Sequence, residues 1–291
     1  MNDGGPRAGV RVLLYALLWI TFNYGLQFVV IGFSGFTADP FSPQRISQEE
    51  LLSFLAALGA ALFMAQIERR PVDVYGLPRA LGFGKLFWQG CVLGLVEVTL
   101  LVCLIAVFGG YSFGELSIRG FEVAHWGGLW FVAFVCVGLY EEYLFRGYAQ
   151  YTLAQGIDFW PAAIILSVLF GAGHLLNPGE SYVGVAGVVA TGLLFAFTLR
   201  RTGNLWLAVG WHASFDFGET FLYSVPDSGM LFTHHLSNAN LHGPAWLTGG
   251  SVGPEGSVLS FITLGVMALL THVLFPSKKT EPAQKLTDQT I

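Results

Sequence analysis

The sequence predicts an all-α protein that crosses a membrane several times. Of its 291 residues, 54% are hydrophobic and only 11% are charged, whereas soluble proteins carry about 25% charged residues. The mean hydropathy is +0.60. The apolar residues also fall into runs of the length that a helix needs to cross a bilayer, which is about 20 residues. This composition places the chain in the membrane class and suggests no nucleic-acid partner.

Eight apolar segments are candidate membrane-spanning helices. The first, Val12–Phe33, follows Arg7 and Arg11, but it is too long for the apolar region of a signal peptide. We therefore interpret it as a retained span. The remaining segments are Leu51–Ile67, Leu86–Phe108, Leu129–Tyr148, Trp160–Leu176, Val183–Leu199, Leu205–Tyr223 and Leu259–Phe275. Together they predict one transmembrane domain over residues 1–276, followed by a polar, disordered cytoplasmic tail at 277–291.

The distribution of Lys and Arg predicts the orientation in the membrane. With Arg146 left aside, 11 basic residues lie in segments expected on one side, and only Arg45 and Arg119 lie on the other. Positive residues accumulate on the cytoplasmic side of membrane proteins. We therefore expect both termini to be cytoplasmic and the protein to be a multi-pass protein of the cell membrane.

Neither the histidines of the long loop nor the cysteines strongly indicate a metal site or a disulfide. The loop at 224–258 contains three histidines, and its Gly-, Asn- and Ser-rich composition favours a solvated extracytoplasmic loop over a metal site. The three cysteines lie inside apolar runs and predict neither a disulfide nor a metal-binding pair. These histidines and cysteines are His234, His235, His242, Cys91, Cys103 and Cys136.

Ionisable side chains inside the spans are the main functional signal, because a charge in the bilayer is costly and is usually functional. In "YEEYLFR", Glu142 and Arg146 are four residues apart on one helical face, so we expect a neutralising pair. Glu141 points about 100° away from Glu142 and has no basic partner in its helix. We therefore expect Glu141 to face a water-filled cavity or other polar groups.

Two further stretches carry histidine and carboxylate. In "HASFD", His212 and Asp216 are also four residues apart, and their side chains should converge. His174 ends "FGAGH", where a single histidine would usually be a core residue, but polar groups on several membrane helices tend to cluster. A turn near Asp158 would bring the glutamates and His174 to a similar depth in the cytoplasmic half of the bilayer. The span that contains His174 should then end within the membrane.

A carboxylate, two histidines and a second carboxylate around a wet pocket are suited to the hydrolysis of an acyl bond. Glu141 is our candidate for the general base, and His174 would share the water or pass a proton to the leaving amine. His212 and Asp216 would stabilise the oxyanion or complete a metal site. Glu141, His174, His212 and Asp216 are acceptable zinc ligands, so a divalent metal stays open as a cofactor. No Ser or Cys lies beside a base as a nucleophile.

The stretches "EEYLFR", "FGAGH" and "HASFD", in this order, resemble the three motifs of the CPBP family of intramembrane endopeptidases. That family comprises type II CAAX prenyl endopeptidases and bacteriocin-processing or self-immunity proteins. The resemblance covers about residues 126–223. It implies a glutamate-dependent protease, formerly described as a metalloprotease. The residue roles that it implies are a water-activating pair, a supporting ion pair and an oxyanion-binding pair: Glu141 with His174, Glu142 with Arg146, and His212 with Asp216.

Asp216 departs from the eukaryotic-type pattern of the family, in which Asn stands at this position. An ionised aspartate has no hydrogen to donate to an oxyanion. Asp216 would therefore be protonated, orient His212, or bind a metal.

The sequence thus predicts an intramembrane endopeptidase that cleaves a peptide or protein substrate, with a lipidated C-terminus as one form of that substrate. The alternatives are a non-catalytic bacteriocin-immunity or peptide-binding membrane protein, a metal-dependent variant of the protease, and a proton-coupled transporter. The last is disfavoured because the sequence has no clear internal repeat. No role is assigned to Glu97, Glu219 or His272.

Overall fold

The computed structural model describes residues 7–34 and 39–276, and the tail predicted to be disordered, 277–291, lies outside the described residues. The described chain is mostly helical. Its strands are β1 (Tyr111–Ser112) and β2 (Asn240–Leu241), which pair antiparallel. The predicted all-α membrane fold is confirmed.

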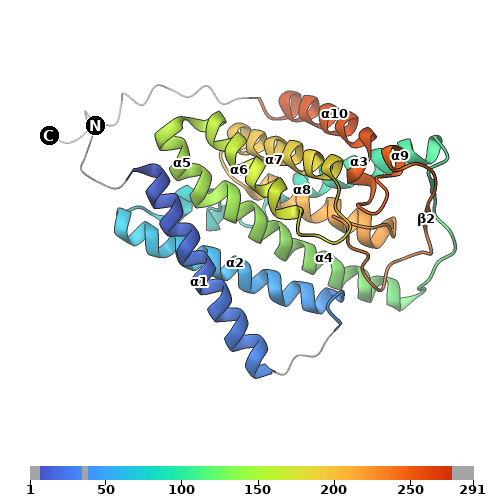
Figure 1. Ribbon diagram of the computed structural model, residues 1–291, viewed down its shortest axis with the longest axis horizontal. Helices are drawn as coiled ribbons and strands as arrows, with labels where there is room; N and C mark the ends of the chain where they lie inside the picture. The colour runs from blue at the N-terminus through green and yellow to red at the C-terminus, as the bar shows by residue number, and fades with distance from the viewer. Residues whose placement is uncertain (1–6, 35–38, 277–291) are drawn as a thin grey trace.

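The longer helices form a bundle, which Figure 1 shows in chain order from blue to red. They are α1 (Ala8–Ser34), α2 (Pro43–Glu68), α3 (Lys85–Val107), α4 (Phe121–Glu142), α5 (Gln150–Ile157), α6 (Phe159–His174), α7 (Tyr182–Thr202), α8 (Trp206–Phe217) and α10 (Val258–Leu274). The short helical segments are η1 (Val72–Tyr75), η2 (Arg79–Leu81), η3 (Tyr143–Ala149), η4 (Gly218–Leu222), α9 (Ala245–Thr248) and η5 (Pro254–Gly256). Helix α4 packs against α2 and α8, α8 also packs against α3, and α6 packs against α7.

Each of the eight predicted spans overlaps a helix. Among the described residues, five helical stretches are long and apolar enough to cross a membrane: Ala8–Val30, Pro43–Glu68, Lys85–Val107, Phe121–Ile157 and Tyr182–Thr202. The other three predicted spans coincide with α6, with α8 and its continuation η4, and with α10, which are shorter. The protein is therefore a multi-pass membrane protein, and five of the predicted spans are supported by helix length.

Local sequence signals explain several helix ends. Ser42 precedes α2, with Pro43 as the first helical residue, and its hydroxyl accepts a hydrogen bond from the amide of Arg45. Ser181 caps α7 in the same way. Such caps satisfy amides that the helix itself leaves free. Asp158 separates α5 from α6 with a φ of 69°, so the predicted turn lies where the sequence placed it.

Helices α3 and α8 approach closely because glycines line their contact. A methyl group on Gly90 would collide with the carbonyl oxygen of Leu207, and one on Gly94 would collide with the Trp211 carbonyl and the Ser214 hydroxyl. Small residues allow backbones to approach in membrane bundles, where van der Waals packing drives association. Because α8 contains His212 and Asp216, this contact fixes the position of one side of the predicted site.

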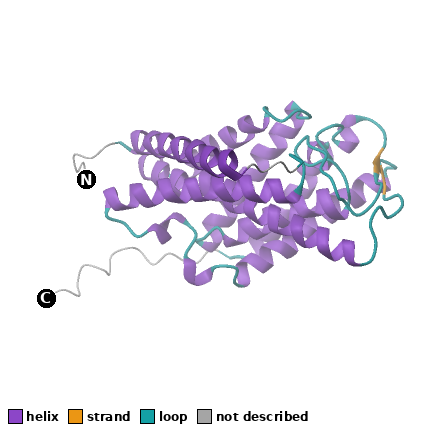
Figure 2. Cartoon of the chain, turned by 90° about the horizontal axis from the view of Figure 1, so that it is seen from below, coloured by secondary structure: helices purple, strands orange, loops and turns teal. Residues whose placement is uncertain are grey.

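The loop after η4, residues 224–258, has both exposed and buried residues. His234 and His242 are exposed, as expected for a solvated loop. Val225, Phe232 and Val252 are buried, so parts of the loop also pack into the protein. Figure 2 shows loops, together with the strand pair, gathered at one end of the bundle.

The close contact between α3 and α8 leads to a stability prediction. We expect Gly90→Ala to destabilise the fold by about 1–3 kcal/mol, because the new methyl group meets backbone that cannot move away easily. Thermal unfolding of the purified protein in detergent measures this effect. Gly128→Ala in α4 is the matched control, since nothing lies within 4 Å of a Cβ at that position. Equal melting temperatures for the two variants would contradict the predicted close packing.

Candidate active site

A buried ion pair lies at the centre of the site. The Nη1 atom of Arg146 lies 3.4 Å from Oε1 of Glu142, and the two residues are 1% and 0% exposed. The same Glu142 oxygen lies 2.9 Å from Nδ1 of His212. The sequence predicted the pair between Glu142 and Arg146, and the structure adds His212 from α8 as a second partner of the same carboxylate.

His212 connects the two motif helices. Its other ring nitrogen, Nε2, lies 3.5 Å from Oε2 of Glu141 and 3.5 Å from Oδ2 of Asp216. Carboxylates therefore face both ring nitrogens of the imidazole, and a ring nitrogen that carries hydrogen can donate a hydrogen bond to the carboxylate beside it. The ring also stacks near Phe195, with 5.5 Å between centroids. The expected convergence of His212 with Asp216 is present, and Glu141 joins it.

His174, the last residue of α6, is held by its own helix. Its Nδ1 lies 3.0 Å from the carbonyl oxygen of Phe170. Because a carbonyl only accepts, Nδ1 is the protonated nitrogen in the neutral ring and Nε2 is left as an acceptor. Phe170 also packs under Arg146, with the guanidinium carbon 4.4 Å from the ring centroid. One aromatic residue thus connects the ion pair to His174.

Four of the six predicted site residues line a cavity of about 590 Å³. Glu141, His174, His212 and Asp216 all lie on its wall, together with many apolar side chains from α1, α4, α6 and α7. The Glu141 side chain is 22% exposed, whereas Glu142 is fully buried. The two adjacent glutamates therefore differ as the sequence predicted: Glu142 belongs to the buried pair and Glu141 faces the cavity.

π-Helical turns interrupt the helices that contain two of the motif stretches, "EEYLFR" and "HASFD". The chain changes from α-helix to π-helix directly after Glu142, and Gly147 has a non-helical ψ of −118°. It changes again after Phe217, one residue beyond Asp216. π-Helical turns are rare and frequently mark functional sites. The stretch "YEEYLFRGY" nevertheless lies inside one helical stretch, Phe121–Ile157, which ends at the turn predicted near Asp158.

Glu50 on α2 is a cavity carboxylate that the sequence analysis missed. It lines the same cavity as Glu141, and its Oε2 atom is buried without a hydrogen-bond partner among the described residues. Its sequence signal is weak, because "QEE" precedes the apolar run that begins at Leu51 and resembles an ordinary polar helix end.

The residues left without a role also have defined positions. Oε2 of Glu97 accepts a 2.6 Å hydrogen bond from the indole of Trp211, and Glu97 also reaches the cavity wall. Glu219 is fully buried beside Asp227 and Glu255. The backbone carbonyl of His272 accepts a hydrogen bond from Arg201.

The four residues predicted as metal ligands do not form a converging set in this structure. Within the described part of the chain, the group of three His, Cys, Asp or Glu residues whose ligand atoms all lie within 4.8 Å of one another is Glu219, Asp227 and Glu255. Both nitrogens of His212 face carboxylates instead of a shared central point. The motif residues therefore do not present a preformed metal-binding arrangement.

Residues 123–218 match the family model "Type II CAAX prenyl endopeptidase Rce1-like". The matched segment contains all six predicted site residues and agrees with the resemblance to the CPBP family, so that prediction is confirmed. No curated protein and no solved structure matches the chain. This match supports an intramembrane protease at family level, and the family implies a peptide or protein as the substrate.

The buried ion pair leads to a second stability prediction. Arg146→Met should lower the stability by about 3–5 kcal/mol, because it leaves the Glu142 carboxylate buried without its basic partner. The double variant Glu142→Gln/Arg146→Met should recover part of this loss, since neither charge then remains. Thermal unfolding of the two single variants and the double variant measures the coupling. If the two single losses simply add in the double variant, the pair does not act as one unit.

Proposed function

We propose that this chain, whose residues 123–218 have the signature of a type II CAAX prenyl endopeptidase, hydrolyses a peptide bond with water activated by Glu141 and His174. The single observation that supports this most directly is the difference between the two adjacent glutamates. Glu142 is bound to Arg146 and His212 inside the protein, whereas Glu141 is on the cavity wall. A general base needs this access to its substrate and water.

In the proposed reaction, a water molecule binds between the Glu141 carboxylate and Nε2 of His174. Glu141 accepts a proton as the water oxygen attacks the carbonyl carbon of the scissile bond. The resulting tetrahedral intermediate then collapses, the C–N bond breaks, and the proton passes from Glu141 to the leaving nitrogen. The products are a carboxylic acid and an amine, and the acid then loses its proton to the amine. Phe170 supports this scheme because its carbonyl occupies Nδ1 of His174 and leaves Nε2 for the water.

His212 is the proposed donor to the oxyanion. Its Nε2 atom faces the cavity side, near Glu141 and Asp216, while Glu142 holds Nδ1. In this scheme Asp216 acts on His212 rather than on the substrate, because an ionised carboxylate cannot donate a hydrogen bond. This choice among the three roles open to Asp216 rests on the 3.5 Å approach of its carboxylate to the ring. Preorganised donors of this kind stabilise the charge that develops during acyl transfer.

The proposed substrate is a peptide with a lipid-modified C-terminus. The cavity has polar groups around Glu141 and His174, while α1 contributes apolar and aromatic wall residues such as Val12 and Trp19. A mostly apolar pocket with a few converging polar groups is typical of sites for apolar ligands. The family model that matches residues 123–218 is that of type II CAAX prenyl endopeptidases, which agrees with this substrate class.

The role of Glu141 is tested by an isosteric substitution. We expect Glu141→Gln to lower the cleavage rate by about 10²- to 10⁴-fold, since the amide cannot accept the proton of the attacking water. Cleavage of a fluorogenic peptide by the protein in lipid nanodiscs measures the rate. Glu122→Gln is the control, because Glu122 is an exposed glutamate at the start of the same helix. Unchanged cleavage by a folded Glu141→Gln variant would eliminate Glu141 as the base, and retained peptide binding would show that only chemistry is lost.

The lipid on the substrate is tested with paired peptides. We expect a farnesylated peptide to have a KM at least about tenfold lower than its unmodified counterpart, because each buried methylene contributes about 0.8 kcal/mol. Initial rates over a range of peptide concentrations give both constants. Equal kcat/KM values for the two peptides would show that the cavity binds the peptide without the lipid.

A further inference from the structure

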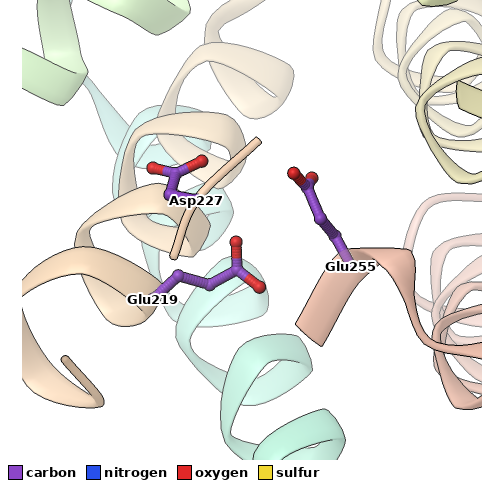
Figure 3. A group of neighbouring side chains, drawn as sticks. All are labelled: Glu219, Asp227 and Glu255. Carbon is purple, nitrogen blue, oxygen red and sulfur yellow. The ribbon is translucent and has the colours of Figure 1, made fainter. Parts of the chain in front are cut away.

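A second group of carboxylates lies outside the three motifs. Glu219 is in η4, Asp227 is in the loop that follows, and Glu255 is in η5 ahead of α10. One carboxylate oxygen of each lies within 4.8 Å of the others. Figure 3 shows the three side chains reaching from separate segments toward a common space.

The backbone brings these three segments together. The amide of Val225 donates to the carbonyl of Glu219, which turns the chain back over the end of η4. Asp227 and Met230 then exchange backbone hydrogen bonds across a tight turn. Gly253 has a φ of 109°, and a side chain there would collide with the carbonyl of Pro226. Glycine at 253 thus lets the segment that contains Glu255 approach the segment that contains Asp227.

The local charge is unbalanced. Residues 202–276 contain no Lys or Arg, and among the described residues none of these three carboxylates takes part in a salt bridge. Glu219 is 0% exposed and Asp227 is 5% exposed. A buried carboxylate is costly unless it is paired, hydrogen-bonded or bound to a metal. Asp227 accepts one hydrogen bond, from the Thr220 hydroxyl at 3.1 Å.

Glu219 gives the observation that points to a ligand. Both of its carboxylate oxygens are buried without a hydrogen-bond partner in the described structure, and so is Oε1 of Glu255. The Glu219 carboxylate points into the space between the other two (Figure 3). A fully buried acidic side chain with two unused oxygens, directed at two other carboxylates, lacks a positive partner at that point.

We propose that Glu219, Asp227 and Glu255 form a binding site for a hard divalent cation, with calcium the best match. Calcium takes carboxylate oxygens at about 2.3–2.6 Å. Two oxygens bound to one calcium are therefore at most about 4.6–5.2 Å apart, the separation across the ion, and the mutual separations in the cluster stay within 4.8 Å. Oxygen-only ligands disfavour zinc and copper, which prefer nitrogen or sulfur.

The ion would join three parts of the fold. It would connect the end of η4, the turn at Asp227–Met230 and the start of α10, and so hold the loop region 224–258 against the bundle. Asp227 and Glu255 also line the cavity that contains Glu141 and His174. Cation binding would therefore stabilise this part of the cavity wall without providing a catalytic group.

The first test measures binding to the unmodified protein. The full-length chain in nanodiscs, stripped with chelator, is titrated with calcium, magnesium or manganese and followed by calorimetry and thermal unfolding. We expect saturable binding of one calcium per chain and a melting temperature that rises with calcium concentration, as for any ligand of the folded state. Absence of both effects at millimolar calcium would overturn the proposal and leave the carboxylates neutralised by protons.

A matched pair of variants locates the site. Glu219→Gln should weaken calcium binding by at least about tenfold, because affinity follows the number of charged ligands. Glu115→Gln should leave binding unchanged, since Glu115 is an exposed glutamate in a loop that contacts the 224–258 region. Equal affinity in the two variants would place any bound calcium elsewhere and overturn the assignment. If Glu219→Gln does not fold, Asp227→Asn replaces it, with the same expected loss.

Discussion

The buried ion pair between Glu142 and Arg146 is the interaction on which the rest of the site depends. Both side chains are almost completely excluded from solvent, where a single charge would be very costly. The pair makes the charge tolerable, and its carboxylate then orients His212 through Nδ1. Arg146 packs on Phe170, whose carbonyl fixes His174. One pair thus positions the histidines of two other helices while leaving Glu141 facing the cavity.

The helix packing explains why these groups stay together. Helix α8 lies between α3 and α4, and the glycines of α3 allow its backbone to come close. This contact holds His212 and Asp216 at a fixed depth. π-Helical turns interrupt the two motif helices, one at Tyr143–Ala149, which contains Arg146, and one at Gly218–Leu222, which follows Asp216 by two residues. Irregular backbone inside a membrane is tolerated where protein or a cavity surrounds it, which is the case here.

The cavity has two acidic regions with different charge balance. Around His212, three carboxylates are accompanied by Arg146 and by the imidazole itself. Around Glu219, three carboxylates lie in a stretch, residues 202–276, that contains no Lys or Arg. In the first region the guanidinium and the imidazole offset part of the negative charge. In the second region the proposed cation would do so.

The features of this protein that depend on short spacing along the chain could be predicted from the amino-acid sequence alone. The membrane class, the helices, the pairing of Glu142 with Arg146 and the different direction of Glu141 all follow from composition and from 3.6 residues per turn. The contacts between residues from distant segments could not be predicted in this way and are seen only in the folded protein. The contact of His212 with Glu142 spans 70 residues, and Glu50, Asp227 and Glu255 reach the cavity through loops and helix ends without periodic signals. Such contacts depend on the packing of whole helices and on tight turns, and neither is encoded in local periodicity.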